Sequence, residues 1–175
     1  MHLARLALVV TVALAACASP RVSAPAPAAP ADAAPSLAGT WTLIAADAIT
    51  EDGTRVKDYG ESPAGLLIVD PDGRYSIQIY RTSGRPPFAS GDKAGATPAE
   101  LSAAVIGSST HIGRCAIDPG GTTLTFHVEH AVYPNWEGTT QVRPFTLRGD
   151  ELEYKVISPT SKRVAISVWH RVRRG

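Results

Sequence analysis

Cysteine is scarce in this sequence, and the shortage excludes a fold held together by disulfides. The 175 residues contain only two cysteines, Cys17 and Cys115. Cys17 ends an apolar N-terminal segment, and if Cys17 is modified there, Cys115 has no partner for an intramolecular disulfide. A domain of about 140 residues can bury roughly two-thirds of its unfolded surface, so it does not need such a bond. We expect Cys115 to be a buried apolar residue of a strand.

The sequence also lacks the motifs of several enzyme and binding classes. It has no Gly-x-Ser-x-Gly, no phosphate-binding glycine loop and no zinc motif. No basic stripe is interleaved with aromatic residues, and the formal net charge is only +1. Removal of residues 1–16, whose only charged residue is Arg5, leaves a net charge of zero. A neutral chain has no field that attracts nucleic acid, so we predict no nucleic-acid partner. Because the zinc and phosphate-binding motifs are missing, we also predict no metal and no cofactor.

No apolar run is long enough to span a membrane as a helix, which takes roughly 20 residues. The run Leu6–Ala13 follows the basic residue Arg5 and leads into Leu14-Ala15-Ala16-Cys17. This arrangement is typical of a secretory signal peptide. The ending resembles a bacterial lipobox, which implies removal of residues 1–16 and lipidation of Cys17. Ala18 in place of aspartate then implies an outer-membrane lipoprotein that faces the periplasm of the cell envelope.

Residues 17–36 form a linker in this interpretation. The stretch is dominated by alanine and proline, as in Ala24-Pro25-Ala26-Pro27-Ala28-Ala29-Pro30. Pro-rich linkers adopt extended conformations of about 3.1 Å per residue. The segment therefore predicts a tether that holds residues 37–174 tens of ångströms from a membrane surface.

Residues 37–174 predict an all-β domain, because short apolar segments alternate with turn signals. One example is Asp70-Pro71-Asp72-Gly73, a turn between two strands. The expected strands are 39–48, 64–69, 75–79, 110–117, 123–133, 140–147, 151–157 and 163–172. Eight antiparallel strands can close into an up-and-down barrel with room for side chains or one small ligand.

One short helix is predicted between the strands. Thr97 is a capping residue, Pro98 suits the first helical position, and Glu100 completes a capping box. The helix would continue to about Ile106, after a long irregular loop over 81–95.

The stretch from Phe126 to Arg143 begins as a strand with one polar face. Strand alternation places Phe126, Val128 and His130 on one face, and His127 and Glu129 on the other. The polar face lies either in bulk water or along a cavity. The same choice exists in the strand 75–79, where either Ser76 and Gln78 or Tyr75, Ile77 and Ile79 face inward.

Several segments, in order and over nearly all of residues 37–172, resemble the bacterial lipocalin-like domain family. They are Gly39-Thr40-Trp41, Asp70-Pro71-Asp72-Gly73, Arg85-Pro86-Pro87-Phe88-Ala89-Ser90-Gly91-Asp92, His127-Val128-Glu129, Pro134-Asn135-Trp136-Glu137-Gly138-Thr139, Gln141-Val142-Arg143 and Trp169-His170-Arg171-Val172. The resemblance implies an up-and-down barrel with a central cavity. It also implies a structural contact between Trp41 and Arg171 that seals one end.

The candidate ligand-binding residues are Arg85, His127, Glu129, Trp136 and Arg143. An arginine can bind a carboxylate through two hydrogen bonds, and Trp136 lies in a turn where it can cover an opening. A pocket with apolar walls and a few polar groups is the usual design of a ligand site.

The predicted function is therefore the binding of a small, largely apolar molecule, with a carboxylate or other polar head group, by a barrel anchored at the cell envelope. Two alternatives stay open. One is an isomerase- or cyclase-type enzyme that uses His127 and Glu129 as an acid–base pair. The other is a structural or protein-binding module of the envelope.

Overall fold

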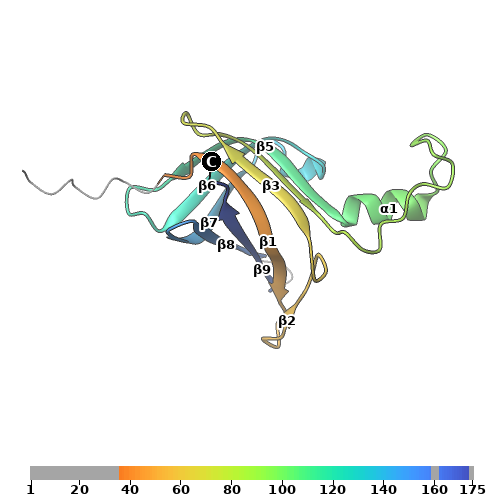
Figure 1. Ribbon diagram of the computed structural model, residues 1–175, viewed down its shortest axis with the longest axis horizontal. Helices are drawn as coiled ribbons and strands as arrows, with labels where there is room; N and C mark the ends of the chain where they lie inside the picture. The colour runs from red at the N-terminus through yellow and green to blue at the C-terminus, as the bar shows by residue number, and fades with distance from the viewer. Residues whose placement is uncertain (1–35, 159–161, 174–175) are drawn as a thin grey trace, which may run out of the picture. The chain divides into compact units, whose positions relative to one another are not determined.

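Nine strands in one antiparallel sheet account for most of residues 36–158 and 162–173, which are the residues that the computed structural model describes (Figure 1). They are β1 (Gly39–Ile49), β2 (Arg55–Val56), β3 (Ala64–Val69), β4 (Arg74–Tyr80), β5 (Ser108–Ile117), β6 (Thr123–Ala131), β7 (Thr140–Arg148), β8 (Glu151–Ile157) and β9 (Val164–Arg171). All eight predicted strands are present, and the sequence pattern missed only the two-residue strand β2. The predicted signal peptide and Cys17, and the linker as far as residue 35, lie outside the described residues.

The sheet closes on itself, because β1 pairs with β9 at one end of the strand order and with β3 at the other. Neighbours in the sheet are also neighbours in sequence, as in an up-and-down barrel. The short strand β2 pairs only with the end of β1 and adds nothing to the ring of eight. The predicted eight-strand antiparallel barrel is confirmed.

Large apolar side chains from most of the strands fill much of the barrel interior. The most deeply buried are Trp41, Ile77, Leu67, Leu124, Phe126, Leu152, Tyr154 and Trp169. In β4 the inward set is Tyr75, Ile77 and Ile79, whereas Ser76 and Gln78 are half-buried on the other face. The apolar alternative left open by the sequence is thus the correct one.

Trp41 and Arg171 lie in contact at the end of the barrel where residue 36 enters. The Arg171 guanidinium lies 4.0 Å from the centroid of the Trp41 ring. It also donates hydrogen bonds to the carbonyl oxygens of Ser36 and Ala38, while the Trp41 indole donates to Leu37. A stacked arginine–aromatic pair contributes roughly 0.5–2 kcal/mol. The contact fastens the entering chain to both the first and the last strand.

A bulge between β5 and β6 interrupts the strict alternation of β6 at Glu129. Gly113 pairs with Val128 and Ile112 pairs with His130, so Glu129 is the extra residue. A Cβ atom at Gly113 would lie 2.0 Å from the carbonyl oxygen of His127, so only glycine fits there. His130 is exposed as a result, and its predicted place on the face of Phe126 and Val128 is wrong, because a bulge breaks strict alternation.

The helix α1 (Pro98–Ile106) projects from the barrel and contacts mainly β5 (Figure 1). It begins with the predicted capping box, in which Glu100 N–H donates to Thr97 Oγ1 and the Glu100 carboxylate accepts from Thr97 N–H. A 3-10 helix, η1 (Pro134–Trp136), forms the turn between β6 and β7. No helix within the described ranges is both long and apolar enough to cross a membrane.

Candidate functional site

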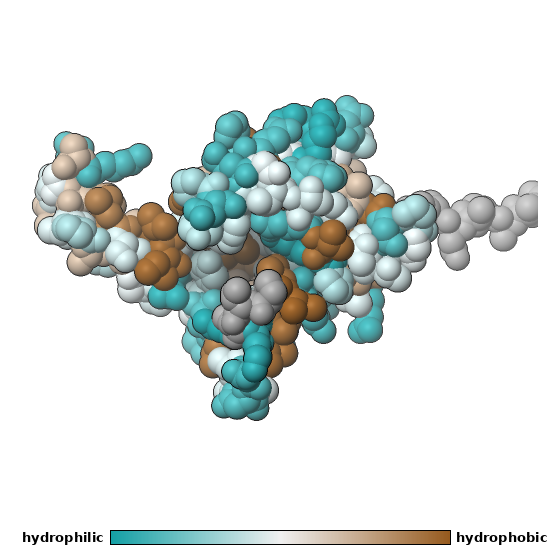
Figure 2. Space-filling model, turned by 180° about the vertical axis from the view of Figure 1, so that it is seen from behind, coloured by the Kyte–Doolittle hydropathy of each residue, from teal (hydrophilic) through white to brown (hydrophobic). Residues whose placement is uncertain are grey.

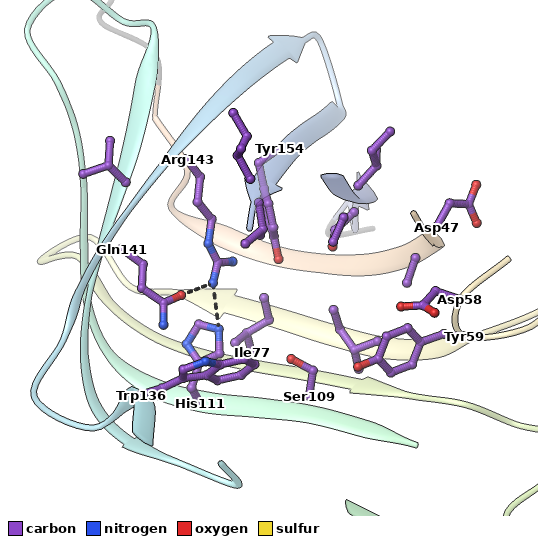
Figure 3. Close-up of a pocket in the computed structure, with 18 residues that line it drawn as sticks. Asp47, Asp58, Tyr59, Ile77, Ser109, His111, Trp136, Gln141, Arg143 and Tyr154 are labelled. Atoms are coloured by element: carbon purple, nitrogen blue, oxygen red, sulfur yellow. Dashed lines mark hydrogen bonds between the residues drawn. The ribbon is translucent and has the colours of Figure 1, made fainter. Parts of the chain in front are cut away.

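The barrel contains a cavity of about 450 Å³ at the end away from the Trp41–Arg171 contact. Its apolar wall comes from Ala46, Ile77, Ile79, Val156 and Ala165. Its polar groups are supplied mainly by Tyr59, Ser109, His111, Gln141, Arg143 and Tyr154 (Figure 3). Pockets for small ligands have volumes of about 300–1,000 Å³ and a similar mix of apolar walls and few polar groups. The face of the barrel seen in Figure 2 is hollowed near its centre, and apolar side chains border the hollow.

Arg143 is the dominant polar group of the cavity. It points inward from β7 and is only 4% exposed. No ion pair joins Arg143 to an acidic residue within the described part of the chain. Burial lowers the pKa of Arg143 from its ordinary value, although an arginine stays protonated in proteins. The cavity thus holds a positive charge that no carboxylate of residues 36–158 or 162–173 neutralises.

Neutral groups partly stabilise the charge of Arg143 in place of an acidic partner. Its Nη2 donates to Gln141 Oε1 at 2.5 Å and lies 3.4 Å from His111 Nε2 (Figure 3). The guanidinium carbon lies 4.5 Å from the centroid of the Phe126 ring and 4.9 Å from that of Tyr154. Contacts of this kind stabilise a desolvated cation by about 2 kcal/mol or more. They also hold the guanidinium in one position.

His111 is a neutral acceptor for Arg143. Burial, followed by the repulsion from Arg143, lowers the pKa of His111 to about 3. An arginine can only donate, so Nε2 of His111 accepts from it and Nδ1 carries the proton. Nδ1 then donates to the hydroxyl of Tyr75 at 2.7 Å. The chain Arg143–His111–Tyr75 fixes the tautomer of the histidine.

Two buried polar atoms next to this network have no hydrogen-bond partner among the described residues. They are Nε of Arg143 and the hydroxyl oxygen of Tyr154. Most buried polar atoms in native proteins are paired, so each exception calls for an explanation. Both residues line the cavity and lie side by side in Figure 3. The site therefore offers unused hydrogen-bond donors beside a buried positive charge.

Paired carboxylates lie at the other end of the cavity. Asp47 forms an ion pair with Arg55 at 2.7 Å, and Asp58 pairs with Arg163 at 3.0 Å. Tyr59 lies next to Asp58 and away from Arg143 (Figure 3). The charges at this end are largely balanced, in contrast to the isolated charge of Arg143.

Of the predicted site residues, Arg143 and Trp136 line the cavity. Trp136 comes from η1, is half-buried, and makes an edge-to-face contact with His111 at 5.8 Å. Arg85 does not line this cavity. It stacks on the ring of Tyr80 at 5.2 Å and packs its side chain against Gly107 at the end of α1.

The expectation that His127 and Glu129 line the cavity is wrong. Both are exposed on the outer face of β6, because Phe126 and Val128 take the inward positions. Glu129 forms an ion pair with Arg74 at 2.9 Å, and His127 Nδ1 lies 3.0 Å from Thr140 Oγ1. The two residues therefore have no place as an acid–base pair inside this barrel.

Sequence patterns did not identify several polar groups of the cavity. They are Tyr59, Ser109, Gln141 and Tyr154 as lining residues, and His111 as the partner of Arg143. The alternation Gln141, Arg143, Phe145 along β7 was the available signal, because Phe145 marks the inward face. The contact of His111 with Arg143 joins β5 to β7 across the barrel, and no local pattern predicts it.

Cys115 is a free, half-buried cysteine of β5, and burial raises the pKa of its thiol to about 11. A thiol with a raised pKa is a poor nucleophile at neutral pH. Within residues 36–158 and 162–173, no group of three or more histidine, cysteine, aspartate or glutamate side chains is arranged to hold a metal ion.

The geometry thus defines an up-and-down β-barrel of eight strands with an internal cavity and a buried cation in its wall. The chain belongs to the lipocalin-like domain family, whose model matches residues 38–172.

Two solved structures resemble the barrel at low sequence identity. One is a de novo designed fluorescence-activating β-barrel, with 14% identity, a TM-score of 0.41, and coverage of 81% of this chain and 99% of the design. The other is a variant of the fluorescent protein UnaG, with 11% identity, a TM-score of 0.35, and coverage of 78% and 96%. No curated protein sequence matches the chain.

Proposed function

We propose that the barrel binds a small, largely apolar molecule that carries an acidic head group, and that Arg143 binds this head group. The observation that carries the proposal is a buried guanidinium without a carboxylate partner in the described part of the chain. Burying an unpaired charge is costly, and a ligand carboxylate would supply the missing opposite charge.

The unused donors support the same orientation of the ligand. Nε of Arg143 and the Tyr154 hydroxyl are buried, unpaired and adjacent to the cavity. A carboxylate accepts charge-assisted hydrogen bonds from such groups. Ile77, Ile79 and Val156 would then surround the apolar part of the ligand.

The test compares two probes with the same alkyl chain, dodecanoate and dodecanol, by titration calorimetry. We expect the wild-type protein to prefer the acid. In Arg143→Met the affinity for dodecanoate falls about tenfold or more, equivalent to about 1.4 kcal/mol, while that for dodecanol changes little. Arg85→Met is the matched control, because this arginine lies outside the cavity.

The proposal is rejected if the wild-type protein binds neither probe, or if Arg143→Met keeps the preference for the acid. Arg143→Met leaves the acceptors Gln141 Oε1 and His111 Nε2 without their donor, so a loss of binding has to be separated from a loss of stability. Thermal unfolding of the unliganded variant checks this point.

The site of action proposed for the protein is the bacterial cell envelope, with a lipid on Cys17 as the anchor. Support comes from the sequence Leu14-Ala15-Ala16-Cys17 behind an apolar segment and from the Ala/Pro-rich stretch that follows. A tethered barrel stays near the membrane, where sparingly soluble acids partition. The mass of the mature N-terminal segment tests the anchor.

A further inference from the structure

The wall of the barrel is incomplete between β7 and β8. The two strands pair only from Phe145 with Tyr154 to Arg148 with Glu151. Residues 140–144 of β7 pair with β6 alone, and residues 155–157 of β8 pair with β9 alone. We call the unpaired stretch between residues 140–144 and 155–157 the seam.

Pro144 explains where the ladder stops. The neighbouring Phe145 N–H donates to Thr122 on the side of β6. Successive backbone groups of a strand point to opposite sides, so the nitrogen of Pro144 faces β8. Proline has no N–H to donate, and a ladder cannot continue through it on that side. Pro144 therefore determines the position of the seam.

The cavity reaches the outer surface through the seam. Arg143 and Tyr154 point inward, so Val142 and Ile157 point outward by alternation, and they are 61% and 63% exposed. Both nevertheless line the cavity. A cavity enclosed by these two strands would contact only their inward side chains.

The exposed apolar pair is unusual for a position in contact with water. Val142 and Ile157 are among the most exposed large apolar side chains in the described ranges, and they flank one opening. Apolar groups that border an opening are stabilised when a ligand covers them, because their surface is removed from water.

Resting on the proposed function, we propose that the seam is a subsite for the hydrocarbon tail of the ligand. The acid binds at Arg143, the chain runs past Ile77 and Val156, and its distal part leaves the barrel between Val142 and Ile157. The ligand class is then a long single-chain carboxylic acid, in preference to a compact molecule that the barrel encloses completely.

The test uses a short acid, octanoate, and a long one, palmitate, with the variant Val142→Thr/Ile157→Thr. Threonine keeps the branching at Cβ and a high strand propensity, but a hydroxyl replaces a methyl group of Val142 and the ethyl group of Ile157. We expect the affinity for palmitate to fall about fivefold or more because apolar burial is lost, and the affinity for octanoate to stay within about twofold because the short chain remains inside.

The matched control is Ile44→Thr/Ile68→Thr, which changes two exposed apolar residues of β1 and β3 that do not line the cavity. It should bind both acids like the wild type. In a second variant, Pro144→Val, the restored N–H allows the ladder to extend, and we expect palmitate affinity to fall while octanoate affinity persists.

Two results with the Val142→Thr/Ile157→Thr variant would overturn the subsite: equal losses of affinity for both acids, or unchanged binding of palmitate. The proposed function would remain intact in either case if Arg143→Met still abolishes the preference for acids. Failure of the wild-type protein to bind either acid would overturn both proposals.

Discussion

At the scale of single residues, the buried Arg143 is the feature that sequence patterns place correctly but cannot explain. Its charge is held by Gln141, by neutral His111 and by the faces of Phe126 and Tyr154. These contacts lower the cost of burial without neutralising the charge. The proposed role of Arg143, the binding of an acidic head group, depends on this charge staying unneutralised.

His111 makes folding sensitive to acid. In the unfolded chain its pKa is near 6.5, whereas burial and Arg143 lower it to about 3 in the folded protein. Between these values the unfolded state takes up a proton that the folded state does not. Stability is therefore lost as the pH falls from about 6.5 towards 3, by up to about 1.4 kcal/mol per pH unit.

The measurement is urea unfolding at a series of pH values. We expect His111→Gln to lose part of the wild-type decline in the free energy of unfolding below pH 6.5. His170→Gln, at an exposed position of β9, is the control and should keep the wild-type profile. Identical profiles for wild type and His111→Gln would contradict the assignment.

At the scale of elements, α1 depends on its own sequence more than on packing. None of its residues is buried. Its stability depends on the capping box formed by Thr97 and Glu100. The Glu100 carboxylate also accepts a hydrogen bond from Ala89 N–H. An element with so few tertiary contacts opens independently of the barrel.

Thr97→Ala should therefore loosen α1 and leave the barrel intact. Loss of an N-cap typically costs about 1 kcal/mol. We expect amide exchange in residues 101–106 to accelerate about fivefold, the equivalent of that free energy, with no comparable change in β1 or β9. Ser102→Ala, on the exposed surface of the helix, is the control. Faster amide exchange throughout the barrel in Thr97→Ala would contradict the prediction and show that α1 is coupled to the barrel.

Two irregularities in the strands decide how the wall of the barrel is built. The bulge at Gly113 breaks the alternation of β6 and leaves His130 exposed, and Pro144 ends the ladder between β7 and β8. The first keeps one polar side chain out of the interior, and the second leaves a stretch in which β7 and β8 do not pair. Both rest on a residue whose backbone chemistry no other residue type reproduces.

At the scale of the whole molecule, closure of the sheet brings residues from six different strands to one cavity. β1, β4, β5, β7, β8 and β9 all contribute to its lining. The Trp41–Arg171 contact fastens the first strand to the last at the opposite end. The packed end supplies stability, and the hollow end is free to accept a ligand.

The anchor is a prediction about the whole chain. We expect the mature protein, isolated from a membrane fraction, to begin at Cys17 and to carry a diacylglyceryl group, as shown by mass spectrometry. Cys17→Ser should abolish the modification, whereas Cys115→Ser, at the half-buried cysteine of β5, should not. An unmodified N-terminus on a freely soluble mature protein would contradict the prediction.

The strands, most turns and the capped helix were predictable from sequence because they depend on neighbouring residues. The alternation in 75–79, the turn at 70–73 and the capping box at 97–100 are local patterns, and each forms as expected. Of the five candidate ligand-binding residues, Arg143 and Trp136 line the cavity, and that they bind a ligand stays a prediction.

The tertiary structure alone decided which polar residues face inward and which of them meet. His127 and Glu129 lie outside because one face of β6 must supply Phe126 and Val128 to the core, a choice that depends on all the other strands. His111 reaches Arg143 only when the sheet closes and brings β5 and β7 to the same lumen. The sequence by itself determines the period of each strand, but the closed barrel selects the face that each strand turns toward its interior, because burial is a property of the whole sheet.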